Sequence, residues 1–279
     1  MNPVIAGALR QVRIETRIQL LSLTGLSWLL WPAIGLGVLF FLRDTSVMQT
    51  SVSLAQLGTP GVIAMYIVTG GLLGIAGALS AEREDGTLLR AKAVPGGIAA
   101  HLLGNVVTYG LVALLPVSVI LVGAALTVDG VLPTTADRWL LLFGVSLLAL
   151  VSTMPAGAVI GAVVRGPLAM GIIGMLITAS LAISGIFYPL AALPTWLQWV
   201  GQALPTYWVG VGLRAAILPA EASVLELHGS WQLGTMLVML LTWAVVGAIA
   251  APIALRRMAR RQSGSAVSAA RERVLTKGY

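Results

Sequence analysis

The side chains of this chain that could perform chemistry are few, and their types exclude most forms of catalysis. There is no cysteine, and only two histidines, His101 and His228, occur in 279 residues. Thiol nucleophiles, disulfides and thiolate metal sites are therefore excluded. The sequence also lacks the GxxxxGK[ST] loop of nucleotide-binding proteins, the HExxH zinc motif and the GxSxG nucleophile turn. We therefore predict no catalytic residue, metal or cofactor in this chain, which is not an enzyme by itself.

One dense group of charged side chains lies at residues 82–92, which read EREDGTLLRAK. It holds six of the 27 charged residues and directly follows an uncharged apolar run. Gly86 is suited to end the helix that continues from this run, because glycine has no Cβ to hinder the turn. Thr87 can cap a second short helix over 87–94, which Pro95 would stop. Such a helix, apolar on one side and basic on the other, suits docking on a partner. A solvated loop is the alternative.

The surrounding elements must lie in a membrane. The chain is 58% hydrophobic and 10% charged, whereas soluble domains carry roughly 25% charged residues. Several uncharged runs reach the length of about 20 residues that a transmembrane helix needs. We therefore predict an all-α polytopic membrane protein with six transmembrane helices. The runs cover about 22–42, 61–81, 98–128, 140–164, 167–187 and 233–255.

Apart from His101, close to one end of the third run, these runs contain no acidic or basic side chain. Ion-coupled transporters usually need such groups near the middle of the membrane. If the protein moves a substrate, we expect the energy to come from elsewhere.

The distribution of basic residues predicts the orientation of the chain. Fourteen of the 17 lysines and arginines lie in the N-terminal segment, residues 82–97, Arg165 and the C-terminal tail. Because Lys and Arg are retained in the cytoplasm, both termini are expected there. The net charge of +7 then reflects topology and attraction to anionic lipids, and not nucleic-acid binding. The three remaining basic residues are Arg43, Arg138 and Arg214.

The two ends of the chain have their own patterns. In residues 1–21, Arg10, Arg13 and Arg17 would lie on one side of a helix and apolar residues on another. This pattern predicts an amphipathic helix at the cytoplasmic membrane surface, with a frayed basic tail as the alternative. Residues 256–279 form a basic cytoplasmic tail.

Residues 188–218, between the fifth and sixth runs, are apolar but contain several prolines. Tryptophan and tyrosine cluster here, and both favour the membrane–water boundary. We predict two short extracellular re-entrant helices, at about 194–203 and 206–217. A seventh full span is disfavoured by the central prolines and by Arg214.

Small residues recur at helical spacing within the spans. They allow helix backbones to approach closely, within the chain or between two copies of it. Ordinary enrichment of glycine in membrane helices is the alternative. The glycines are Gly70, Gly74, Gly77, Gly157, Gly161, Gly171 and Gly174.

Two motifs resemble those of a known family. The pattern E-R-E-x-G-T-L-L with a later proline, at residues 82–95, resembles the cytoplasmic loop after the second span of ABC type-2 exporter permeases. The pattern G-I-F-Y-P-L…L-P-x-W-L-Q…L-P-T-Y-W…L-R, at residues 185–214, resembles the region after the fifth span of that family. Among its subfamilies, the chain looks most like bacterial drug and antibiotic exporters.

The resemblance implies a division of labour between subunits. This chain would be the permease of an ATP-driven exporter in the bacterial plasma membrane. It would pair with a second permease chain as a homodimer, with spans two and five near the interface. Two copies of a separate ATP-binding subunit would hold ATP and Mg²⁺. Residues 87–94 would be the coupling helix that contacts this ATPase. The coupling residues are Glu82, Arg83, Glu84, Gly86, Thr87, Leu88, Leu89, Arg90 and Pro95.

The apolar spans suit a lipophilic or amphipathic cargo such as a drug or antibiotic. Export of a lipid-linked glycan or polysaccharide, or an ATP-independent channel, are the alternatives. Packing in the core or against lipid is the alternative role for each residue of the predicted substrate path. That path comprises Met65, Tyr66, Thr69, Met175, Thr178 and Ser180. A predicted extracellular gate comprises Phe187, Tyr188, Pro189, Trp196, Tyr207 and Trp208.

Overall fold

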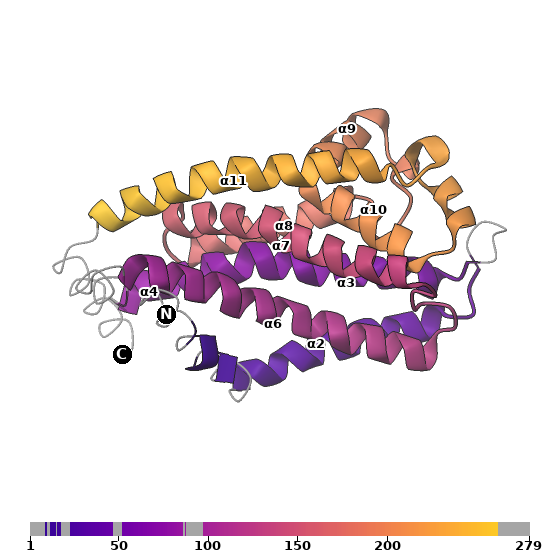
Figure 1. Ribbon diagram of the computed structural model, residues 1–279, viewed down its shortest axis with the longest axis horizontal. Helices are drawn as coiled ribbons and strands as arrows, with labels where there is room; N and C mark the ends of the chain where they lie inside the picture. Colours follow the sequence, from indigo (N-terminus) through magenta and orange to yellow (C-terminus); the bar gives the residue numbers. More distant parts are fainter. Residues whose placement is uncertain are drawn as a thin grey trace.

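The computed structural model describes residues 23–46, 52–85, 87 and 97–261, and residues 9, 12–14, 16 and 17 nearer the N-terminus. This part of the chain is helical and contains no strand beyond one isolated bridge between Ser46 and Ser53. The long helices run side by side along the longest axis of the molecule (Figure 1). They are α2 (Leu23–Leu42), α3 (Leu54–Thr69), α4 (Ile75–Asp85), α6 (Gly97–Thr127), α7 (Ala136–Val163), α8 (Pro167–Ile183) and α11 (Leu233–Arg261).

Among the described residues, four helices are long and apolar enough to cross a membrane. They cover Leu54–Arg83, Leu103–Thr127, Ala136–Val163 and Leu233–Met258. A polytopic, nearly all-helical membrane protein is therefore supported. The predicted first and fifth spans correspond to the apolar helices α2 and α8, and α8 has 17 residues, the lower limit for a span. Six spans stay a prediction, as do the N-terminal interfacial helix and the C-terminal tail, most of whose residues lie outside the described part.

The second span is one long helix with an irregular centre. A π-helical turn, η1 (Gly70–Gly74), joins α3 to α4. Such single turns widen a helix locally and are frequent at functional sites. The sequence of the turn is GGLLG, so three of its five residues leave room for neighbouring helices.

Helix α7 packs against this turn through backbone contacts. A Cβ atom added to Gly157 would lie 2.5 Å from the carbonyl oxygen of Leu72, and one added to Gly161 would lie 2.9 Å from Cα of Ala76. A Cβ on Gly71 would in turn collide with the side chain of Thr153. For Gly157 and Gly161, the predicted close helix packing is found within the chain. Nothing lies within 4 Å of a Cβ built on Gly77, Gly171 or Gly174.

Two short helices lie between α8 and α11, at the end of the bundle opposite α4 (Figure 1). They are α9 (Thr195–Ala203) and α10 (Pro205–Ile217), flanked by the 3₁₀ turns η2 (Leu190–Ala192), η3 (Ala220–Leu225) and η4 (Leu227–Gly229). Every residue of α10 is buried, and the helix packs against α3, α7 and α11. Protein therefore covers α10 itself, whereas parts of the flanking turns, such as Val224 in η3, are exposed. Helix α9 instead exposes Trp196 and Trp199.

A buried ion pair fixes α10 in place. The Nε of Arg214 donates to a carboxylate oxygen of Glu226, and both side chains are only 5% exposed. Arg214 Nη1 also donates to the carbonyl oxygen of Gly185, at 3.1 Å. These contacts tie α10 to the end of α8 and to the loop before α11. Breaking such a buried pair leaves an uncompensated charge, so we infer that α10 is a fixed element.

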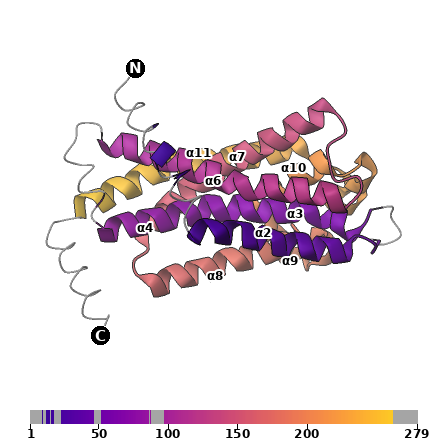
Figure 2. The ribbon, with the colours of Figure 1, turned by 90° about the horizontal axis from the view of Figure 1, so that it is seen from below.

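Helix α8 lies at the edge of the bundle (Figure 2). Only Ile177 and Leu181 are buried in it, whereas Leu168 and Met175 are largely exposed. Its main contact within the chain is with α9. Most of its surface is thus available to lipid or to another protein.

The contact between Gly157 and the π-helical turn generates a stability prediction. Gly157→Ala should lower the thermal midpoint in detergent, because the new Cβ forces α7 away from the Leu72 carbonyl. Overpacking of this kind costs about 1–3 kcal/mol. Gly144→Ala on the same helix is the control, since its Cβ would meet nothing within 4 Å. Equal midpoints for the two variants would contradict the close packing.

Candidate functional site at the C-terminal end of α4

The acidic end of the second span is held by polar contacts to the start of α6. Asn105 Nδ2 donates to Oε1 of Glu82 at 2.6 Å, and His101 Nε2 lies 2.9 Å from Oε2 of the same carboxylate. The Glu82 and His101 side chains are 14% and 10% exposed. Because His101 and Asn105 are four residues apart, they share one face of α6. We call Glu82, His101 and Asn105 the polar clamp.

The neighbouring arginine joins α4 to a third helix. Arg83 Nη1 donates to the carbonyl oxygen of Val164 at 3.2 Å, and Nη2 donates to that of Gly161. Val164 is the C-cap of α7, where the last carbonyls have no partner within the helix. A cation at this position also interacts favourably with the helix dipole. Arg83 therefore caps α7 and fixes its end to α4.

Together these contacts hold both ends of the segment between α4 and α6. α4 ends at Asp85 and α6 begins at Gly97, so the intervening segment is anchored on one side by Glu82 and Arg83 and on the other by His101. A force applied to this segment would reach α4, α6 and α7 at once. This arrangement is suited to mechanical transmission.

One expected pairing differs from the structure. The sequence suggests that Glu82 and Glu84 pair with basic groups of the predicted N-terminal helix, for example Arg13 or Arg17. The structure instead pairs Glu82 with His101 and Asn105. For Glu82 the reason is physical: His101 and Asn105 lie on the neighbouring helix α6, and the sequence does not indicate whether α6 or the N-terminal segment lies nearer to Glu82. Two polar residues four apart, in an apolar run facing an acidic helix end, are the signal that would have revealed the clamp.

The other coupling residues are described only in part. Glu84 and Asp85 belong to the last turn of α4, and Thr87 is half-buried. The remaining predicted coupling residues lie outside the described residues, as does the helix predicted over 87–94. These residues are Gly86, Leu88, Leu89, Arg90 and Pro95.

The predicted substrate-path residues lie on two separate helices. Met65, Tyr66 and Thr69 are half-buried on α3, and Met65 and Tyr66 pack against the core. The residues on α8 are exposed or half-buried, and their hydroxyls bond to their own helix: Thr178 Oγ1 donates to Gly174 O at 3.0 Å, and Ser180 Oγ to Ile177 O at 2.7 Å. Thr69 Oγ1 likewise donates to Met65 O at 2.6 Å. Met175 is 67% exposed.

The predicted gate residues divide between core and surface. Tyr207 and Trp208 are buried and form an edge-to-face pair with ring centroids 4.8 Å apart. Trp208 Nε1 donates to Gln202 O at 2.7 Å, which fixes the ring. Trp196 and Phe187 are exposed. Pro189 precedes η2, and Tyr188 Oη donates to the carbonyl oxygen of Ala182.

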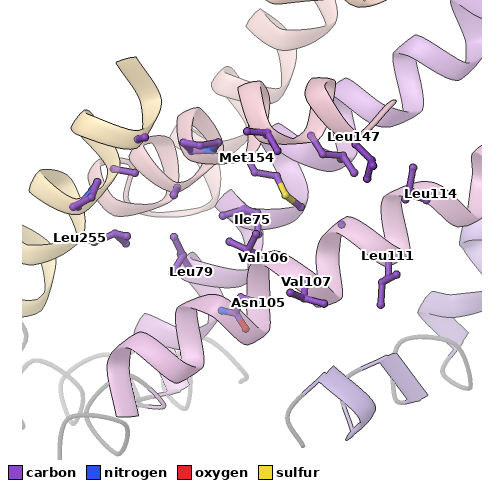
Figure 3. Close-up of a pocket in the computed structure, with 18 residues that line it drawn as sticks. Ile75, Leu79, Asn105, Val106, Val107, Leu111, Leu114, Leu147, Met154 and Leu255 are labelled. Atoms are coloured by element: carbon purple, nitrogen blue, oxygen red, sulfur yellow. The ribbon is translucent and has the colours of Figure 1, made fainter. Parts of the chain in front are cut away.

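Sequence reasoning missed an apolar groove beside the polar clamp. It has a volume of about 490 Å³ and is lined by residues of α4, α6, α7 and α11. Figure 3 shows Leu79, Asn105 and Leu255 toward one end of it and Leu114 and Leu147 toward the other. None of the predicted path or gate residues lines this groove. The residues that line it come from four separate spans, so no local sequence pattern could have predicted it.

Comparison with known proteins agrees with this architecture. Residues 39–251 match the family described as ABC-2 family transporter protein. No curated protein matches the chain. The matched region begins in α2 and ends in α11. It includes the polar clamp, Arg83, α10 and the lining of the groove except Pro252 and Leu255. Because the match covers most of the sequence, the chain belongs to the ABC-2 transporter family and is one of its membrane permeases.

Proposed function

We propose that this permease exports a lipophilic or amphipathic compound, such as a drug or antibiotic, with energy from ATP hydrolysed by a separate ABC ATP-binding subunit. The observation that carries the proposal is the polar clamp together with Arg83. These residues join three membrane helices at the base of the segment that resembles a coupling helix. The ATPase would dock on this segment in the cytoplasm.

The clamp supplies a physical route for coupling. Closure of two ATPase subunits around ATP must favour one conformation of the permease over another. The segment between α4 and α6 would receive this bias. Because Glu82 is bonded to α6 and Arg83 to the end of α7, the segment cannot move without these helices. The long helix from Leu54 to Asp85 would carry the motion across the membrane.

The distribution of charge supports an external energy source. In the four long membrane helices, the acidic and basic side chains stand at the ends: Glu82 and Arg83, Asp137 and Arg138, and Arg256 and Arg257. Helices α2 and α8 have none. An ion-coupled transporter would need such groups deeper in the membrane.

The cargo is inferred from the lining of the spans. The hydroxyls of Thr69, Thr178 and Ser180 are bonded to their own helices, so a path along α3 and α8 would offer mainly apolar contact. Apolar contact favours lipophilic compounds over a hydrated glycan, which needs many hydrogen bonds. Among the path candidates, the exposed Met175 has the flexible side chain that accommodates varied shapes.

A second permease copy would complete this path. Gly171 and Gly174 lie one helical turn apart on α8, and a Cβ atom built on either would meet nothing within 4 Å. Small residues at this spacing favour close packing of two membrane helices. We therefore propose that two copies pair through α8, and that the α3 and α8 candidates meet at this interface.

The proposed activity can be tested in inside-out membrane vesicles. Vesicles that contain the permease and its co-purifying ATPase should accumulate a lipophilic dye only when ATP and Mg²⁺ are supplied. Leu88→Asp or Leu89→Asp should abolish uptake while leaving membrane insertion intact, because a charge would enter an apolar docking surface. Dye flux that is independent of ATP would contradict the proposal, as would purification of the permease without any bound ATPase.

The polar clamp can be tested separately from docking. Glu82→Gln keeps an acceptor for Asn105 but removes the charge facing His101, a loss of about 1–3 kcal/mol for a buried polar contact. We expect dye uptake per ATP hydrolysed to fall roughly tenfold with the ATPase still bound. Glu221→Gln is the matched control, since this exposed acid lies in η3 at the other end of the bundle. Wild-type coupling in Glu82→Gln would show that the clamp does not transmit motion.

Pairing through α8 predicts a change in oligomeric state. Gly171→Leu should shift the purified permease from dimer to monomer, because the larger side chain separates the helices. The control is Gly144→Leu, at another exposed glycine where an added Cβ meets nothing within 4 Å. Multi-angle light scattering in detergent measures both. If both variants stay dimeric, the interface must lie elsewhere.

A further inference from the structure

The apolar groove opens sideways from the helix bundle. It is lined by residues of α4, α6, α7 and α11 (Figure 3). Several of its lining residues are also exposed on the outside of the bundle: Val107 and Leu111 of α6, Val151 of α7, and Ala248 and Pro252 of α11. In a membrane, these residues face the hydrocarbon of the bilayer. The groove is therefore accessible to lipid without passing through the protein.

The lining suits a hydrocarbon chain. Asn105 is its one polar side chain, and the Asn105 amide already donates to Glu82 at 2.6 Å. The rest is aliphatic, apart from Met154, with no aromatic ring to stack on a flat molecule. The volume of about 490 Å³ lies in the range of roughly 300–1,000 Å³ typical of ligand sites. A flexible chain can fill such a groove, whereas a polar compound would find no partner there.

A basic side chain stands at the clamp end of the groove. Pro252 and Leu255 line the groove, and Arg256 follows Pro252 by four residues, on the same face of α11. Arg256 is exposed. An arginine at this depth can bind a phosphate oxygen through two parallel N–H donors, and basic sites between membrane helices at the cytoplasmic surface bind anionic headgroups.

We propose that this groove binds one acyl chain of an anionic phospholipid from the cytoplasmic leaflet, with the headgroup phosphate at Arg256. The site is separate from the predicted substrate path and gate, none of whose residues line it. It is also separate from α8, the helix proposed to pair with a second copy. The lipid would contact α4, α6, α7 and α11 together and act as a structural component of the bundle.

Native mass spectrometry of the full-length permease tests this site. The purified protein is titrated with phosphatidylglycerol or with phosphatidylcholine of the same acyl chains. Wild type should bind phosphatidylglycerol about fivefold more tightly, the effect of one basic residue near an anionic surface. Ala248→Phe should weaken binding of both lipids about tenfold, since the ring displaces at least two methylene groups from the groove. Val107→Phe, which fills the groove from α6 instead of α11, should do the same.

Helix α11 provides a matched control for the groove-filling variants and another for Arg256. Ile249→Phe adds a ring to an exposed position of α11 that does not line the groove, and should leave binding unchanged. Arg256→Gln should remove the preference for phosphatidylglycerol, whereas Arg257→Gln removes the same charge from another side of α11 and should retain the preference.

Four results would overturn the proposal. The first is equal lipid binding by Ala248→Phe, Val107→Phe and Ile249→Phe. The second is equal affinity of wild type for both lipids, which would remove the role of Arg256. The third is a change in the oligomeric state of Ala248→Phe and Val107→Phe, which would assign the groove to a second copy of the chain. Displacement of the lipid by an exported dye would likewise assign the groove to the cargo.

Discussion

The close contact between α7 and the second span is the constraint on which the rest of the structure depends. Gly157 and Gly161 bring the backbone of α7 against the π-helical turn and the start of α4. This approach places the C-terminus of α7 beside Arg83, which caps it through the carbonyls of Gly161 and Val164. It also brings together two of the helices that line the groove, to which α4 contributes Leu79 and α7 contributes Ala158. A larger residue at either glycine would affect the cap and the groove together.

The polar contacts follow from the demands of a membrane. A buried charge without a partner is costly in hydrocarbon, and in the described helices the charged groups stand at the two ends of the bundle. At one end, Glu82 and Arg83 are bonded to α6 and α7. At the other, Arg214 is bonded to Glu226 and Gly185. The middle of the bundle is held by apolar packing.

Sequence reasoning predicted well those features that depend on local pattern. Uncharged runs of span length indicated the long helices, and proline positions indicated α9 and α10 between α8 and α11. Features that depend on which helices are neighbours could not be predicted. The partners of Glu82 come from α6, and the partners of Arg83 are backbone carbonyls of α7, which no side-chain pattern identifies. Tyr207 and Trp208 illustrate the same limit: their composition suggested a boundary position, but α10 is inserted among α3, α7 and α11 and buries both.

The polar clamp and the apolar groove share the same helices, and this links transport to the surrounding lipid. Asn105 belongs to both, since its side-chain nitrogen donates to Glu82 and the same side chain lines the groove. A conformational change that moves α6 relative to α4 must alter the clamp and the groove width at once. A lipid chain that fills the groove in one conformation would stabilise that conformation by its differential affinity alone. The composition of the membrane would then bias the same equilibrium that the ATPase is proposed to drive.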